Sequence, residues 1–219
     1  METLDPAPLR ADARRNHDRI RTAAVEIFRE RGLSAPLEDV AAAAHVSKAT
    51  VFNRFGGRAG LIDAVIDDVA AQELLGVIER ARAVVDIGER IRWYVAALRD
   101  LQYRQPAVNG VILRQVPGSR GLMELCGQGE CFHEELVEQG VASGFLAGTF
   151  EPEDFHALAI ETALVLEERG RPPRPSYDRR TTFLLDGIAR PARVARPGRP
   201  DRHASRDGSG EGTDPGGEA

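Results

Sequence analysis

The sequence has few of the residues on which several classes of enzyme depend. Lys48 is the only lysine, and the other 28 basic residues are arginines, so Schiff-base and lysine-base catalysis have a single candidate side chain. The GxxxxGK loop that cradles nucleotide phosphates is absent. Cys126 and Cys131 are the only cysteines, which is too few for a disulfide framework.

Long apolar segments are also missing. No run of about 18 apolar residues occurs, so no membrane-spanning helix and no membrane partner are expected. Residues 1–15 are polar and charged, and they lack the apolar stretch of a secretory signal. We therefore expect a cytoplasmic protein. Hydrophobic residues make up 42% of the 219 residues, enough to form a substantial core.

Charge is spread unevenly along the chain. Residues 1–60 carry a net charge of +2, residues 61–189 carry −8 and residues 190–219 carry +1. The acidic total of −5 argues against a protein that coats nucleic acid. It is compatible with a small DNA-reading head on an acidic body.

Apolar residues recur at three- and four-residue spacing, and no alternating strand pattern of useful length occurs, so the sequence predicts an all-α fold. Gly127 and Gly129 predict a kink or break in one long helix. The expected helices cover residues 16–31, 37–44, 47–55, 58–69, 87–104, 108–116, 120–143, 152–169 and 177–189.

Two of these helices, residues 37–44 and 47–55, are short and are joined by the tight turn His45-Val46-Ser47. Ser47 is a good N-cap for the second of them. Short helices joined in this way are typical of a helix-turn-helix. The flanking helices supply the apolar faces that such a pair must cover.

The stretch from Ile20 to Val65, IRTAAVEIFRERGLSAPLEDVAAAAHVSKATVFNRFGGRAGLIDAV, resembles the N-terminal DNA-binding domain of the TetR family of bacterial transcriptional regulators. The resemblance lies in the Ala-Ala pair before an apolar-Phe step, in Gly32, and in the xTxFxxFxxRxxL run after the turn. Some positions depart from the family pattern. Phe52 replaces the usual tyrosine, Arg54 a common histidine, His45 the usual glycine of the turn, and Gly56-Gly57 a commoner Pro-polar pair.

A recognition helix places its first turns in the major groove of DNA. Lys48 can donate to a guanine edge or to a phosphate, and Ala49 and the Thr50 methyl can contact a thymine methyl. Arg58 opens the next helix, where a guanidinium and free amides can hold a phosphate. The candidate DNA-binding residues are Lys48, Ala49, Thr50, Phe52, Asn53, Arg54 and Arg58.

The resemblance implies a three-helix helix-turn-helix domain followed by a larger helical domain that binds a ligand and dimerises. We expect a disordered arm over 1–15, the DNA-binding domain over 16–62, the effector domain over 63–189 and a disordered tail over 190–219. Pocket candidates are Trp93, Tyr94, Tyr103, Met123, Cys126 and Phe132. Dimer-interface candidates are Phe155, Leu158, Thr162, Leu166, Phe183, Leu184 and Ile188.

The implied function is that of a ligand-responsive regulator, usually a repressor. It would bind a palindromic operator in double-stranded DNA as a homodimer and be released by a small molecule, without catalysis, cofactor or metal. One alternative is a redox or metal sensor that uses Cys126, Cys131 and His133, although a five-residue spacing on a helix is poor disulfide geometry. A small helical enzyme and an interaction module that has lost DNA binding are further alternatives.

Overall fold

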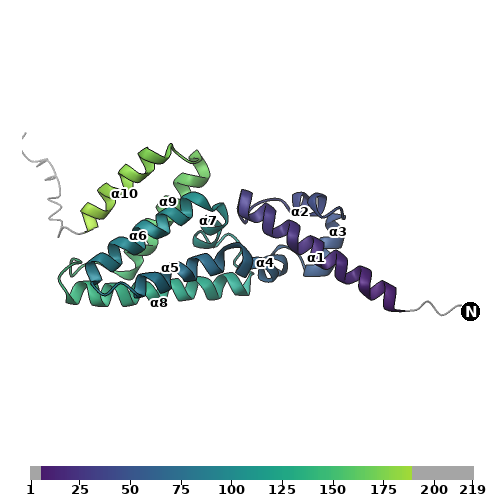
Figure 1. Ribbon diagram of the computed structural model, residues 1–219, viewed down its shortest axis with the longest axis horizontal. Coiled ribbons are helices and arrows are strands. Elements are labelled where there is room, and N and C mark those ends of the chain that lie inside the picture. Colours follow the sequence, from purple (N-terminus) through teal and green to yellow (C-terminus); the bar gives the residue numbers. More distant parts are fainter. Residues whose placement is uncertain (1–5, 189–219) are drawn as a thin grey trace, which may run out of the picture.

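The computed structural model describes residues 6–188, with side chains from residue 14 onward. Within this range the chain is helical and contains no strand (Figure 1), which confirms the all-α prediction. The expected tail over 190–219 and the first five residues lie outside the described residues. The elements are α1 (Pro6–Arg31), α2 (Leu37–Ala43), α3 (Lys48–Phe55), α4 (Arg58–Ile66), the π-helical turn η1 (Asp67–Ala71), α5 (Gln72–Arg82), α6 (Ile87–Arg104), α7 (Pro106–Ile112), α8 (Arg120–Ala142), α9 (Pro152–Arg169) and α10 (Arg174–Ile188).

Helix α1 is longer than the sequence analysis predicted. It begins at Pro6, ten residues before the expected start at residue 16, so the prediction of a disordered arm is wrong for residues 6–15. Pro6 and Pro8 stand in the first turn, where a helix needs no amide donors, so both prolines are compatible with the helix start. Figure 1 shows this part of α1 projecting beyond the other helices of the N-terminal region.

Helix α8 is continuous from Arg120 to Ala142, so the predicted break at Gly127 and Gly129 does not occur. Each glycine lowers helix stability by about 1 kcal/mol relative to alanine. The buried apolar face of the helix, which includes Leu122, Phe132 and Leu136, outweighs that cost.

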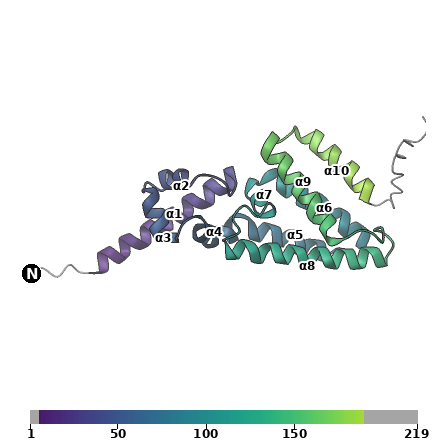
Figure 2. The same cartoon turned by 180° about the vertical axis from the view of Figure 1, so that it is seen from behind.

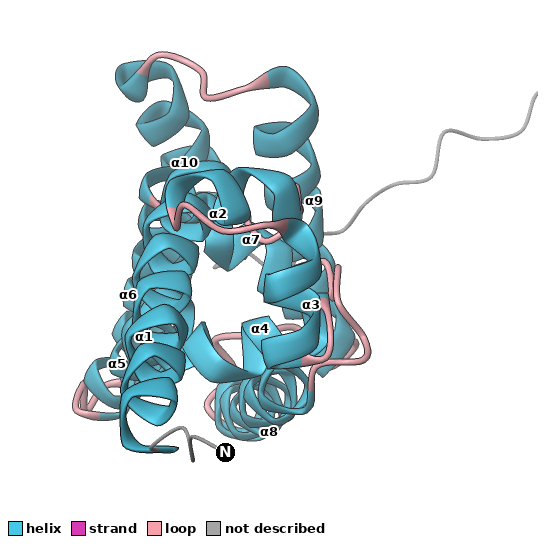
Figure 3. Ribbon diagram, turned by 90° about the vertical axis from the view of Figure 1, so that its right-hand side faces the viewer, coloured by secondary structure: helices cyan, strands magenta, loops and turns pink. Residues whose placement is uncertain are grey.

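The fourth expected helix continues into a further helix that the apolar spacing did not predict. Helix α4 passes through the π-helical turn η1 directly into α5, so residues 58–82 form one helical path from the N-terminal region into the body. Figure 3, which looks along the long axis from the N-terminal region, shows α4 between α3 and α8.

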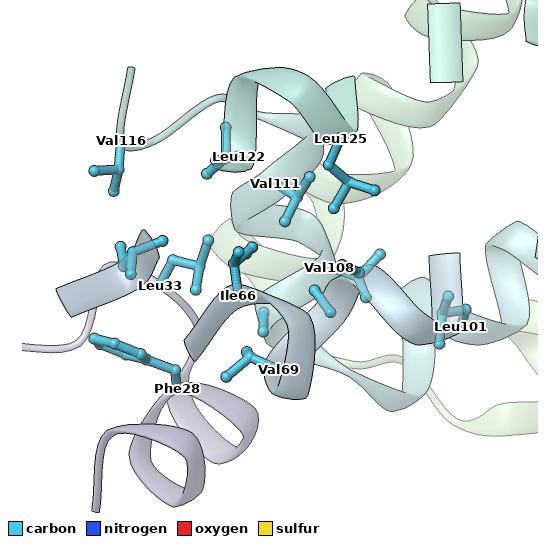
Figure 4. Close-up of a cluster of buried hydrophobic side chains, with 14 of the residues drawn as sticks. Phe28, Leu33, Ile66, Val69, Leu101, Val108, Val111, Val116, Leu122 and Leu125 are labelled. Atoms are coloured by element: carbon cyan, nitrogen blue, oxygen red, sulfur yellow. The ribbon is translucent and has the colours of Figure 1, made fainter. Parts of the chain in front are cut away.

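One hydrophobic core runs through both halves of the molecule. Phe28 and Leu33 from the N-terminal region lie next to Ile66 and Val69, which in turn lie near Val108 of α7 (Figure 4). The core therefore crosses the expected boundary between residues 62 and 63, and that boundary stays a prediction. In the part of the chain that is described, no helix combines the length and apolar character needed to cross a membrane.

Helix α10 lies at the edge of the body. It packs on α6, and Tyr177 is its only buried residue. Figures 1 and 2 both place α10 on the side of the body away from α8.

Candidate DNA-binding surface and ligand cavity

Local interactions fix the ends of α3, the expected recognition helix. The Ser47 side chain accepts a hydrogen bond from the Thr50 amide at 3.1 Å, as predicted for an N-cap. At the other end, Gly56 adopts a left-handed φ of 73° and its amide donates to the Phe52 carbonyl. Val51 is fully buried and holds the inner face of α3 on the core.

The opposite face of α3 is open to solvent. Lys48, Ala49, Asn53 and Arg54 are exposed, and Phe52 is 58% exposed. A phenylalanine so exposed offers an apolar surface that a thymine methyl could contact. Of the remaining candidates, Thr50 and Arg58 are half-buried.

Lys48 has a partner in α2 that no sequence motif indicates. Its Nζ donates to Glu38 Oε1 of α2 at 2.6 Å, and both side chains are 58% exposed. The hydrogen bond from Lys48 lowers the pKa of the Glu38 carboxyl below its ordinary value. Residues ten apart in two different helices carry no local sequence signal, since their contact depends on how α2 packs on α3.

Arg58 is also engaged within the protein. Its Nη1 donates to the Leu33 carbonyl at 2.7 Å, which ties the start of α4 to the loop after α1. The predicted phosphate contact would use the remaining donors of the guanidinium. Gly57 precedes α4 and supplies no side-chain cap, so the first amides of α4 have no capping side chain.

The departures from the family pattern have structural counterparts. His45 adopts a left-handed φ of 54°, a conformation that a side chain disfavours and that the usual glycine would adopt without strain. Phe52 lies over Gly57, because a Cβ placed on that glycine would come within 3.1 Å of the ring. Phe52 and Gly57, which both depart from the family pattern, are therefore in contact.

The body contains an apolar cavity of about 70 Å³ enclosed by α5, α6, α7, α8 and α9. Its lining is mostly apolar, and its polar groups come chiefly from α6, α8 and α9. The lining residues are Leu74, Val77, Ile78, Tyr94, Leu98, Val111, Ile112, Leu125, Cys126, Gly129, Glu130, His133, His156 and Ala159.

Two buried polar side chains meet at this cavity. The hydroxyl of Tyr94 and Nε2 of His133 form a 2.8 Å hydrogen bond. Burial lowers the pKa of His133 to about 4 and raises that of Tyr94. Both groups are therefore neutral at pH 7, so the cavity can offer hydrogen bonds without charge from this pair.

The comparisons with known proteins agree with this geometry. Residues 20–65 match the family model described as bacterial regulatory proteins, tetR family. Residues 20–65 form a TetR-family domain. This confirms the resemblance drawn from the sequence.

The chain is 28% identical over 137 residues to the HTH-type transcriptional regulatory protein RaaS of Mycobacterium tuberculosis. The match spans 62% of each chain. Among solved structures, the regulator FadR of Bacillus subtilis, in complex with stearoyl-CoA, has a TM-score of 0.59 at 14% identity, covering 80% of this chain and 99% of that one.

The ketosteroid transcriptional regulator KstR2 of Mycobacterium tuberculosis has a TM-score of 0.56 at 16% identity, covering 81% of this chain and 95% of that one. At these identities the two structures establish the fold: a helix-turn-helix domain followed by a larger helical domain.

Only some of the pocket candidates line the cavity. Tyr94 and Cys126 line the cavity. Trp93 instead lines a surface groove between α6 and α10, and Met123 is 36% exposed. Tyr103 does not line the cavity, because its hydroxyl donates to the Pro172 carbonyl and its ring contacts Tyr177.

Phe132 is fully buried and contacts the Tyr94 ring edge-on, with ring centroids 5.0 Å apart. It therefore supports the cavity wall from behind. Neighbouring residues on a helix point about 100° apart, which explains why Trp93 and Tyr94 cannot both face the cavity.

The dimer-interface candidates differ in how far they are exposed. Phe155, Thr162 and Leu166 are buried within the chain itself, so their burial does not depend on a partner, and their place at a dimer interface stays a prediction. Leu158, Leu184 and Ile188 are half-buried, whereas Phe183 is 66% exposed. The large apolar side chains of α9 that are most exposed are Leu164 and Val165, at 43% and 44%.

The cysteine-based alternative receives no support. Cys126 and Cys131 are free thiols, and burial raises the pKa of Cys126, which makes its thiolate less accessible. No group of three or more His, Cys, Asp or Glu side chains is placed to hold a metal ion among residues covered by the structure.

Proposed function

We propose that this chain is a DNA-binding transcriptional regulator, most simply a repressor, that reads an operator through α3. The observation that carries the proposal is the TetR-type domain, whose recognition helix presents an exposed face with Lys48, Asn53 and Arg54. The proposal assigns the chain no catalytic activity and a cytoplasmic location.

The body supplies a route by which a ligand could change DNA binding. Asp63 of α4 accepts hydrogen bonds from the Ser119 hydroxyl at 2.6 Å and the Gly121 amide at 2.9 Å, at the start of α8. Helix α8 then continues to the cavity, where it contributes Glu130 and His133. A small molecule that shifts α8 would therefore move α4, and with it the reading head.

The exposed apolar residues of α9 and α10 support a homodimer as part of this proposal. A two-fold dimer would bind a palindromic operator with half-sites about 34–36 Å apart. Replacing Leu164 and Phe183 together by glutamate is expected to give monomers in light scattering. Val85→Glu is the matched control, since Val85 is 93% exposed in the loop before α6. A double variant that stays dimeric would exclude this interface.

DNA reading is tested by selecting duplexes from a random library and measuring fluorescence anisotropy against salt. Selective binding with a steep salt slope is expected. Lys48→Met should weaken binding to the selected duplex about 5- to 150-fold, the range of 1–3 kcal/mol. Arg120→Met is the control, because it removes an exposed charge on α8, and should change affinity less than twofold. Failure to select any sequence would contradict the proposal.

A further inference from the structure

A partly buried cation lies where α6, α9 and α10 meet. Nε of Arg99 donates to Thr181 Oγ1 of α10 at 2.9 Å, and its Nη1 donates to Thr162 Oγ1 of α9 at 2.6 Å. Both acceptors are neutral hydroxyls. Nη2 donates to no residue in the described part of the chain, so the guanidinium keeps free donors.

Arg99 also lacks a counter-charge. Across residues 14–188, no carboxylate lies within 4.0 Å of its guanidinium. The adjacent Asp100 pairs instead with Arg104 at 2.8 Å and Arg174 at 2.7 Å. Burial lowers the pKa of Arg99, and the Tyr177 ring, 4.9 Å away, offers only a cation–π contact. Burying an unpaired charge is costly, and an anion bound here would offset that cost.

Arg99 lines a small cavity that adjoins the apolar one. This second cavity, of about 20 Å³, shares Tyr94, Leu98 and Ala159 with the larger cavity. No other lysine or arginine lines either of them. The two cavities therefore adjoin at these three residues, and Arg99 is the single positive side chain that lines them. A ligand that spans both must displace the side chains between them.

Gln102 adds a second polar group to the smaller cavity. It is only 1% exposed, and its Nε2 donates to the Ala159 carbonyl at 2.9 Å. Its Oε1 has no hydrogen-bond partner. A buried amide oxygen without a donor is rare in folded proteins, which indicates that a hydroxyl or water belongs beside it.

We propose that this chain binds a monocarboxylate with an apolar body, such as a medium-chain fatty acid, with the carboxylate on Arg99 and the hydrocarbon in the cavity beside Tyr94 and Leu98. A guanidinium matches the two oxygens of a carboxylate, and the apolar lining matches a hydrocarbon chain. The carboxylate lies on the Arg99 side, because Gln102 Oε1 would repel it. As an account of the effector, this inference rests on the proposed function.

The test compares three ligands with the same eight-carbon body: octanoate, 1-octanol and octylamine. Calorimetry on the full chain should show octanoate binding at least tenfold more tightly than the alcohol or the amine. Arg99→Met should abolish this preference. Arg92→Met is the matched control, because Arg92 lies on the same helix and reaches the Leu185 carbonyl of α10 at 3.4 Å but lines neither cavity. It should keep the preference within twofold.

Arg99→Lys keeps the charge and should keep a reduced preference for octanoate, about threefold or more. This variant and the wild-type ligand series decide the question if Arg99→Met fails to fold. Equal binding of the three ligands to the wild type would overturn the proposal. So would a preference that survives in folded Arg99→Met, since Arg99 would then serve only to hold α9 and α10 together.

DNA affinity is measured separately with and without octanoate. Release of DNA by octanoate supports both proposals. Octanoate binding through Arg99 with no change in DNA affinity supports the carboxylate site and contradicts its role as effector site. A chain that binds octanoate through Arg99 but reads no DNA keeps the carboxylate site and refutes the proposed function.

Discussion

At Lys48, DNA binding would compete with an ion pair. Glu38 holds the ammonium group at 2.6 Å and places a negative charge beside the surface that would face DNA phosphates. Such a carboxylate reduces attraction to any DNA sequence and can accept a hydrogen bond from a cytosine amino group. Glu38 is therefore a candidate for setting specificity.

Replacing Glu38 by glutamine is expected to raise affinity for unrelated DNA several-fold and to steepen the salt dependence by about one ion, because Lys48 is then free to neutralise a phosphate. Anisotropy titrations on a random-sequence duplex measure both quantities. Asp39→Asn, which removes an acid that pairs with Arg31, controls for the change in net charge. Equal effects of the two substitutions would show that only net charge matters.

The strain at His45 is local and can be removed. Its side chain is exposed and its φ is 54°, so glycine at this position loses no buried contact. His45→Gly should raise the free energy of unfolding by up to about 1 kcal/mol. His45→Ala should give no such gain, because alanine keeps the Cβ that disfavours this φ. Urea unfolding of both variants distinguishes relief of strain from loss of the imidazole.

The local pattern predicted which residues of α3 face solvent, because a helical period fixes the face once Val51 is buried. It did not predict the Glu38 contact or the hydrogen bond from Arg58 to Leu33. These depend on the packing of separate helices, which spacing within one helix does not encode. Tyr94 and Cys126, two of the pocket candidates, line the cavity, whereas the spacing gave no signal for Arg99, which lines the smaller cavity.

At the scale of the elements, two helical glycines differ in whether their surroundings leave room for a side chain. A Cβ on Gly60, in the first turn of α4, would lie 1.8 Å from the Phe55 carbonyl oxygen. The end of α3 and the start of α4 can approach only because residue 60 has no side chain. A Cβ on Gly129, inside α8, would have nothing within 4 Å.

Gly60→Ala is therefore expected to lower the free energy of unfolding by about 2 kcal/mol or more, since backbone must move. Gly129→Ala should raise it by about 0.5–1 kcal/mol through helix propensity. Thermal and urea unfolding measure both. Similar effects of the two substitutions would mean that the contact between α3 and α4 is not tight in solution.

Helix boundaries were predicted well where caps or glycines mark them, as at Ser47 and Gly56. The sequence pattern was less informative where packing against other helices determines the structure. The break expected in α8 is absent because the helix packs along its whole apolar face. Apolar spacing did not distinguish the residues of α9 that are buried within the chain from those that are exposed, because an apolar side chain has the same sequence signal in both places.

At the scale of the whole molecule, one buried histidine couples stability to pH. The folded-state pKa of His133 is about 4, against an ordinary value of 6.5. The unfolded chain therefore takes up the proton first as pH falls. Stability contributed by neutral His133 is complete above pH 6.5 and is lost progressively between pH 6.5 and 4.

Between pH 7.5 and 5.0 this group should lower the free energy of unfolding by about 2 kcal/mol. His133→Asn should remove most of that loss in urea titrations at the two pH values. The pKa of His156 is also lowered, by burial and by Arg114. His156→Asn therefore measures how much of the pH-dependent loss of stability comes from His156. A wild-type stability that is flat over this range would mean that His133 is accessible to water.

The π-helical turn between α4 and α5 bears on how chains of this architecture diverge. A π turn forms when one extra residue is accommodated in a helix whose two ends are already held. Here α4 is held by α1 and α8, and α5 by α6, so the extra residue is accommodated within Asp67–Ala71. Related chains should therefore differ in length by one residue at this junction while both flanking helices keep their buried faces.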